Sequence, residues 1–277
     1  MAPRPRPVKS LVALVAVAAL AVAVMAGCAG SGGVQPVARA ESKDRVTASD
    51  EPESMRRARV RLELASAYFA RGQVTVALDE VKLAIAADPS LSEAFNLRGL
   101  IYANLGDERL AEESFRNALL LNPRDADAMQ NFGWYLCQLK RYPEADSLFR
   151  QALGVPQYRD SARTLLAQGL CQAYAGNLPQ AESTLLQSLQ LAPGNPSTSY
   201  HLAEVLYRRG QHERAQGYLQ RVNGMADMAS AETLWLAIRI EHRLGDGPAT
   251  QALGRRLISG FPTSREATAF QKGAFDE

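Results

Sequence analysis

The hydrophobic pattern divides the chain into three stretches. Residues 11–25 are an uncharged run of Leu, Val, Ala and Met, and residues 29–55 combine mixed charges with little apolar periodicity. From about residue 56 onward, small and apolar residues recur at a fixed interval, which is the usual sign of repeated supersecondary units. Ala and Leu dominate the composition, and because both are strong helix formers the pattern predicts helices rather than sheets.

The interval between matching positions is 34 residues. Pro89 and Pro123 are separated by this distance, and so are Ala77, Ala111 and Ala145 in turn. A period of 34 is that of the tetratricopeptide repeat (TPR), a helix–turn–helix unit, and the order of small residue, Tyr, Ala and Pro matches its pattern. The alternative, a helical bundle with accidental spacing, would not bring these residue types into register four times.

Small residues hold the positions at which the two helices of one repeat meet closely, because a larger side chain would push the helices apart. On the predicted first helices these residues are Ala65, Gly99, Gly133 and Gly169. On the predicted second helices they are Ala77, Ala111, Ala145 and Ala181. The apolar residues expected to fill the space between repeats are Val81, Phe115, Phe149 and Leu185. Proline cannot continue a helix, so second helices are expected to end at Pro89, Pro123 and Pro193.

This register assigns six repeats. They lie near residues 58–91, 92–125, 126–159, 162–195, 196–229 and 230–263, and the sixth fits the pattern loosely. Two extra residues fall in the Gly154–Asp160 loop, and residues 264–277 are expected to form a short cap. We therefore predict an all-α fold, a TPR superhelical solenoid of about six helix–turn–helix repeats with a C-terminal cap, over residues 56–277.

The N-terminal stretch is predicted to be a targeting segment. Basic residues between Arg4 and Lys9 precede the apolar run, which at about 15 residues is shorter than the roughly 20 that a bilayer span needs. Ala26 and Gly27 then lead directly into Cys28, which resembles a bacterial lipobox although Met25 stands where Leu is preferred. We expect residues 1–27 to be a lipoprotein signal peptide, with a plain signal peptide or a single-span anchor as the alternatives.

The expected anchor is an acylated Cys28, which would hold the chain to membrane lipid. Ala29 rather than Asp follows this cysteine, and by resemblance to Gram-negative lipoproteins this favours the outer membrane, facing the periplasm. Residues 28–55 are rich in Gly and contain Pro and mixed charges, so they are predicted to be a flexible tether.

Charge and motif content exclude several functional classes. Removing the three basic residues of the signal segment from the 31 in the chain leaves 28 against 29 acidic residues, which gives no electrostatic case for nucleic acid. The sequence contains no Gly-Lys dipeptide for a P-loop and no H-E-x-x-H motif, and its three histidines, His201, His212 and His242, are widely spaced. We therefore expect no enzyme activity, catalytic residue, metal, cofactor or small-molecule substrate.

Two cysteines fall on neighbouring first helices of the predicted stack. Cys137 lies in the third repeat and Cys171 in the fourth. A disulfide between them is expected because disulfides persist in an oxidising periplasm. The alternative is a pair of buried free thiols, since cysteine is often a core residue.

The inward-facing positions of the first helices predict a protein-binding groove. Its residues are Phe69, Asn96, Leu100, Asn104, Gln130, Trp134, Gln138, Leu166, Leu170, Tyr174, Tyr200 and Tyr207. This mixture of apolar, aromatic and amide side chains suits an apolar or amphipathic segment better than an acidic tail. Trp134 and the tyrosines are the expected anchors, unless Trp134 merely packs between repeats.

A more specific resemblance lies in residues 131–138, Asn-Phe-Gly-Trp-Tyr-Leu-Cys-Gln. This block resembles the signature of the type IV pilus biogenesis/stability lipoproteins, the PilF/PilW (pilotin) family. Residues 169–171, 234–239 and 261–262 also fit that family, and the likeness covers the lipobox and nearly all of residues 56–263.

The resemblance implies a partner and a role that the period alone does not. Proteins of this kind are expected to bind the type IV pilus secretin, the outer-membrane ring protein, and to promote its localisation and assembly into a multimer. Two alternatives remain at this point: a scaffold for peptidoglycan hydrolases, or a subunit of the outer-membrane protein insertion machine.

Overall fold

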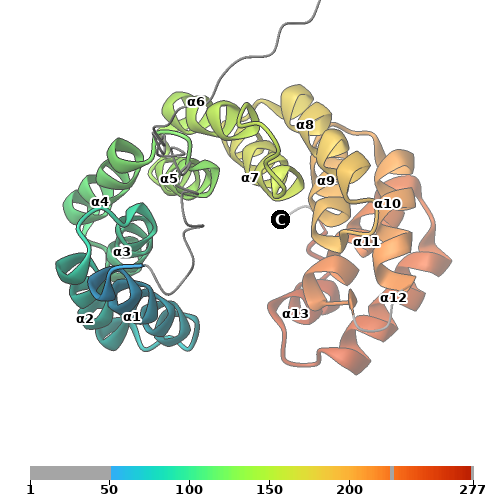
Figure 1. Cartoon of the computed structure of the whole chain (residues 1–277). Coiled ribbons are helices and arrows are strands. Elements are labelled where there is room, and N and C mark those ends of the chain that lie inside the picture. The colour runs from blue at the N-terminus through green and yellow to red at the C-terminus, as the bar shows by residue number, and fades with distance from the viewer. Residues whose placement is uncertain (1–50, 225–227, 276–277) are drawn as a thin grey trace, which may run out of the picture. The chain divides into compact units, whose positions relative to one another are not determined.

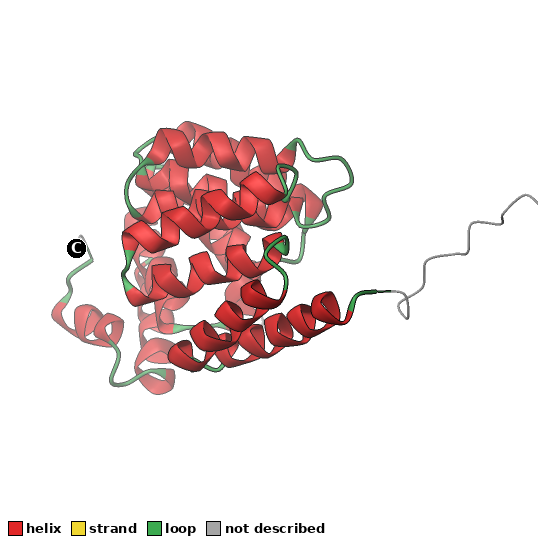
Figure 2. Ribbon diagram, turned by 60° about the vertical axis from the view of Figure 1, so that its left-hand side comes forward, coloured by secondary structure: helices red, strands yellow, loops and turns green. Residues whose placement is uncertain are grey.

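The computed structural model describes residues 51–224 and 228–275. The predicted signal peptide, Cys28 and most of the predicted tether lie outside these ranges. The described residues form thirteen α-helices and contain no strand, with short loops between the helices (Figure 2). None of these helices has both the length and the hydrophobicity needed to cross a bilayer.

The helices follow one another at nearly even spacing along the chain. They are α1 (Glu53–Ala70), α2 (Val74–Ala87), α3 (Ser92–Leu105), α4 (Glu108–Leu121), α5 (Ala126–Gln138), α6 (Tyr142–Leu153), α7 (Ser161–Tyr174), α8 (Leu178–Leu191), α9 (Pro196–Arg208), α10 (His212–Gly224), α11 (Ala231–Leu244), α12 (Gly247–Gly260) and α13 (Arg265–Lys272).

The first twelve helices pack as six consecutive pairs, from α1 with α2 to α11 with α12. Each second helix also contacts the first helix of the next pair, and successive first helices contact one another. The stacked helix pairs form a curved array. In Figure 1, α3, α5 and α9 lie on the inside of this curve and α4, α6 and α10 on the outside. The predicted all-α TPR solenoid with a terminal cap helix is therefore confirmed.

The turn inside a pair requires a residue in the left-handed region. Gly106, at φ 76°, caps α3 in this conformation, which glycine adopts without steric cost. In the third pair Lys140 takes the same region at φ 61°, so this turn forms without glycine.

The small residues of the repeat mark real close approaches between helices. A Cβ atom at Gly99 would lie 2.7 Å from the Phe115 ring, and one at Gly169 would lie 2.7 Å from Leu185 Cγ. Phe115 and Leu185 are fully buried. In these two pairs the register of the helices is thus fixed by the packing of a glycine against a large apolar residue.

The start of the first helix differs from its prediction. Helix α1 begins at Glu53, so residues 53–55, which the sequence pattern assigned to the tether, are helical. Pro52 precedes the helix at φ −52°, and Glu53 lies in the first turn, where a carboxylate interacts favourably with the helix dipole.

Helix α13 closes the C-terminal end by packing on α11 and α12. Ala267 of α13 is fully buried, and the Phe270 ring lies against Gly254 of α12. Phe270 belongs to the same apolar cluster as Leu257 and Ile238, which are both fully buried. The cap is therefore anchored by apolar contacts with both helices of the sixth pair.

Candidate protein-binding face

A disulfide joins the first helices of the third and fourth pairs. Cys137 of α5 and Cys171 of α7 are bonded, with their Cα atoms 5.8 Å apart, and both residues are buried. The bond crosses the boundary between two repeats, which the ion pair between Arg163 of α7 and Asp127 of α5 also bridges at 2.8 Å. It fixes the spacing of the two helices that carry Trp134 and Tyr174.

These two aromatic residues form a pair beside the disulfide. The ring centroids of Trp134 and Tyr174 are 6.4 Å apart with an interplanar angle of 47°. Tyr174 is 58% exposed, and Trp134 is partly exposed while it also packs on the cluster that contains the disulfide. Trp134 therefore contacts the core and the surface at once. An exposed aromatic pair on a cross-linked support is well suited to act as an anchor for a partner.

The other predicted groove residues vary in exposure. Tyr174, Asn104 and Gln138 are exposed. The partly buried ones are Phe69, Asn96, Leu100, Trp134, Leu166, Leu170, Tyr200 and Tyr207. The amide of Asn96 accepts a hydrogen bond from Asn131 Nδ2 at 3.2 Å, so it is already engaged with the next pair.

Gln130 does not line the groove as predicted. It is only 8% exposed, and its Oε1 has no hydrogen-bond partner among the described residues. The side chain at position 5 of this first helix is therefore buried and is not presented to a partner.

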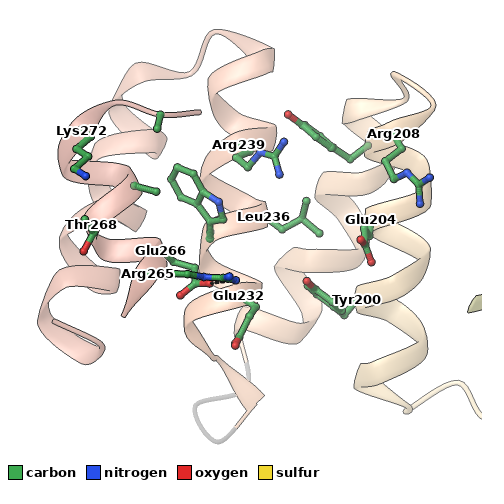
Figure 3. A pocket seen from close by; sticks show the side chains of 14 residues that line it. Tyr200, Glu204, Arg208, Glu232, Leu236, Arg239, Arg265, Glu266, Thr268 and Lys272 are labelled. Carbon is green, nitrogen blue, oxygen red and sulfur yellow. Dashed lines mark ion pairs between the residues drawn. The ribbon is translucent and has the colours of Figure 1, made fainter. Parts of the chain in front are cut away.

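A cavity lies further along the chain, between α9, α11 and α13 (Figure 3). Its volume is about 820 Å³. Its lining residues are Tyr200, Glu204, Tyr207, Arg208, Glu232, Trp235, Leu236, Arg239, Arg265, Glu266, Thr268, Ala269, Lys272 and Ala274. Tyr200 and Tyr207 were predicted as groove residues, whereas the contributions of α11 and α13 were not. We call this space the C-terminal cavity.

Carboxylates gather around one tyrosine of the C-terminal cavity. Burial raises the pKa of Tyr200 to about 12, and the nearby charges of Glu204, Glu232 and Glu266 act in the same direction. The phenol is therefore neutral at any physiological pH and is available as a hydrogen-bond donor.

Glu204 itself remains ionised. A hydrogen bond with His201 (Nδ1 to Oε2, 3.3 Å) lowers the pKa of Glu204, and the charges of Arg208 and Arg239 lower it further against the opposing effect of burial. The cavity thus combines fixed negative and positive groups with aromatic walls.

Arg239 is held in place at the wall between the cavity and the cap. Its guanidinium carbon lies 4.8 Å from the Tyr207 ring centroid, a cation–π arrangement. Its Nε donates to the backbone carbonyl of Phe275 at 3.0 Å. The Phe275 ring in turn stacks on Trp235, with centroids 5.9 Å apart and an interplanar angle of 24°.

An exposed apolar surface lies at the N-terminal end of the stack, on α1 and α2. Val60 and Leu64 of α1, and Val76 and Leu83 of α2, are 40 to 52% exposed. No earlier pair covers this end within the described residues. The sequence pattern did not reveal this surface, because it does not show which apolar positions lack a neighbouring repeat.

The described residues offer no metal-binding cluster. They contain no group of three or more His, Cys, Asp and Glu side chains arranged to hold a metal ion. Ionised groups on the second helices pair with one another, as Arg214 of α10 does with Glu182 of α8 at 2.8 Å. The surfaces suited to a ligand are therefore the aromatic pair, the C-terminal cavity and the exposed apolar end.

Comparison with known proteins agrees with this architecture. Tetratricopeptide repeat models match residues 92–125, 126–155 and 172–232. The type IV pilus assembly protein PilF of Pseudomonas aeruginosa is 27% identical over 210 residues, which cover 76% of this chain and 83% of PilF.

Two solved structures resemble the chain over most of their length. A crystal structure of PilW, described as a widely conserved type IV pilus biogenesis factor, has a TM-score of 0.72 at 30% identity, covering 76% of this chain and 97% of the chain in that structure. A structure of Pseudomonas aeruginosa PilF has a TM-score of 0.70 at 25% identity, covering 80% of this chain and 100% of the chain in that structure.

Proposed function

The chain belongs to the PilF/PilW family of tetratricopeptide-repeat proteins, and we propose on this basis that it acts in type IV pilus biogenesis. Proteins of this family are non-catalytic interaction scaffolds, so its role is to bind another protein. We propose further that the partner is the type IV pilus secretin. Binding would promote the localisation of the secretin and its assembly into a multimer.

The observation that carries this proposal is the Trp134–Tyr174 pair beside the Cys137–Cys171 disulfide. Exposed aromatic side chains provide most of the binding free energy in many interfaces when they are held rigidly. Here the disulfide limits relative movement of α5 and α7, so little conformational entropy is lost when a partner binds. Partly exposed Leu166 and Leu170 extend the same surface with apolar groups.

The proposed location follows from the sequence of the N-terminal segment. Acylation of Cys28 would attach the chain to the outer membrane with the repeats in the periplasm. A tether over residues 29–52, about 24 residues, would have an r.m.s. reach of roughly 27 Å, so the repeats could contact subunits near that surface. The anchored scaffold would thereby raise the local concentration of secretin at the membrane where it assembles.

Capture of the secretin by immobilised chain tests the proposal. Trp134→Ala is expected to weaken capture about 30-fold, because truncating a hot-spot aromatic commonly costs about 2 kcal/mol. Leu120→Ala is the matched control, since Leu120 is a 79% exposed apolar residue on the second helix α4. Circular dichroism of both variants should equal that of the unmodified chain.

Two results would contradict the proposal in different ways. Capture that depends on Leu120 but not on Trp134 would place the interface on the outer face. Capture of peptidoglycan hydrolases or of the barrel insertion machine in place of the secretin would contradict the partner. In cells, a deletion strain should lose twitching motility and accumulate monomeric secretin.

A further inference from the structure

We propose that the C-terminal cavity is a second peptide-binding site, which accepts a protein segment in which an aromatic residue adjoins acidic residues. This site lies on other helices than those that carry the Trp134–Tyr174 pair, although Arg208 of α9 also lines a pocket beside Tyr174. It does not depend on the identity of the partner that the pair binds. It is formed by α9, α11 and the cap helix α13, and its volume of about 820 Å³ lies within the usual range of ligand pockets.

The cations of the cavity supply the first argument. Arg208, Arg239 and Lys272 line it, and none of them forms an ion pair with a carboxylate of the described residues. Arg208 donates instead to the carbonyl of Ala173 at 3.3 Å, as Arg239 does to that of Phe275. These guanidinium groups retain donors for an incoming carboxylate, and such charge-assisted hydrogen bonds are among the strongest in proteins.

Positive and negative side chains are distributed unevenly in the cavity. In Figure 3, Lys272, Arg239 and Arg208 are spread along one end of the cavity from α13 to α9, with Glu204 next to Arg208, whereas Glu232 and Glu266 lie toward the other end. Arg265 at that second end is 3.6 Å from Glu266 and partly balances it. A compact multiply charged anion such as phosphate would meet repulsion from the carboxylates, whereas an extended segment can place its acidic side chains at the cationic end alone.

The aromatic lining supplies the second argument. Tyr207 and Trp235 flank Arg239, and Leu236 continues the apolar wall. Tyrosine and tryptophan can bury the ring of a partner residue while their polar atoms remain hydrogen bonded. The cavity therefore provides an aromatic contact directly beside the cations.

The chain itself shows what kind of segment this wall accepts. The Phe275 ring stacks on Trp235 and on His242, whose centroid is 4.2 Å away, and its carbonyl accepts from Arg239. Asp276 and Glu277 follow Phe275 in the sequence. The described part of this segment thus places the Phe275 ring against Trp235 and the Phe275 carbonyl against Arg239. The open cavity presents Trp235 and Arg239, together with Tyr207, to a second segment of the same character.

A synthetic peptide binding assay with the full chain tests this inference. The probe is the fluorescently labelled peptide Gly-Ala-Phe-Asp-Glu, which repeats residues 273–277. Its amide counterpart, Gly-Ala-Phe-Asn-Gln, has the same shape without charge. We expect the acidic probe to bind about tenfold more tightly than the amide probe, because a hydrogen bond to a charged group is stronger than a neutral one.

Two variants separate the cavity from the rest of the surface. Arg239→Gln and Lys272→Gln should each weaken binding of the acidic probe, by about tenfold for Arg239 because its guanidinium can engage a carboxylate with two donors. Lys272→Gln changes an exposed residue at the edge of the cavity, so its effect does not depend on retention of the Phe275 contact. Arg255→Gln is the matched control, because Arg255 is exposed on α12 and does not line the cavity.

The inference would be overturned by any of three results. The first is no binding of the acidic probe at millimolar concentration, and the second is equal binding of the acidic and amide probes. The third is displacement of the probe by an equimolar amount of inorganic phosphate, which would identify a general anion site. If the Trp134→Ala variant lost secretin capture but still bound the probe normally, the two sites would be shown to act separately.

Discussion

The ring of Phe270 in α13 lies so close to Gly254 in α12 that no side chain could occupy residue 254 without displacing it. This contact attaches the cap to the sixth pair. It also positions the α13 residues that line the C-terminal cavity, so one glycine links the stability of the cap to the shape of a candidate binding site.

Gly254→Ala is therefore expected to displace α13. The added methyl group would overlap the Phe270 ring, and overpacking typically costs about 1–3 kcal/mol. Thermal unfolding should show a lower melting temperature, and limited proteolysis should cleave the chain sooner near residues 261–264. Gly217→Ala in α10 is the control, because nothing lies within 4 Å of a Cβ at that residue. Equal behaviour of the two variants would contradict the role of the contact.

Gly99→Leu tests the register of the repeats. A Cβ at this position already lies 2.7 Å from Phe115, so a leucine must force α3 away from α4. Destabilisation of about 1–3 kcal/mol or more is expected, since neighbouring pairs also lose contacts. A variant that melts within about one degree of the unmodified chain would show that the helices accommodate the change.

The Cys137–Cys171 disulfide should stabilise the fold measurably. It closes a loop across 34 residues, which in the chain-entropy model corresponds to roughly 3–4 kcal/mol. Serine at both positions should lower the urea midpoint, and non-reducing mass spectrometry of periplasmic protein should show the two residues linked. Detection of both as free thiols would exclude the bond under those conditions.

Tyr200 should titrate at unusually high pH. Burial, reinforced by the carboxylates of Glu204, Glu232 and Glu266, raises its pKa to about 12. The folded state thus keeps a proton that the unfolded state loses near pH 10, so this contribution to stability is complete below about pH 10 and is lost as the pH rises to about 12.

Absorbance of ionised tyrosine near alkaline pH measures this transition, with Tyr200→Phe identifying the missing component. Glu204→Gln should lower the Tyr200 pKa because it removes one of the nearby negative charges. If Tyr200→Phe reduced the absorbance change near pH 10 and left the change near pH 12 unaltered, Tyr200 would ionise with the other tyrosines and the expectation would be wrong.

Cys28→Ser tests the proposed anchor. Without the thiol, the chain should not be acylated and should no longer fractionate with the outer membrane. Growth with labelled palmitate followed by fractionation provides the measurement. A labelled Cys28→Ser chain in the outer membrane would rule out the lipoprotein hypothesis.

The sequence by itself determined the repeat architecture. A period of 34 residues with Gly99, Ala111 and Pro123 in fixed order predicts a pair of helices in close contact, because each of these residues acts through local geometry. The same register placed Cys137 and Cys171 on adjacent first helices, and the structure joins them. Because these features repeat along the chain, each repeat strengthens the prediction of the same helix pair in the next one.

Only the tertiary structure decided which inward positions are accessible and where a cavity opens. Gln130 occupies a predicted groove position but is only 8% exposed, because burial depends on packing in three dimensions as well as on helical phase. The C-terminal cavity requires Phe270 to seat against Gly254, a contact between a cap and a loosely matching repeat for which the period carries no information. Arg239 and Trp235 become candidate binding residues only because α13 folds back beside them.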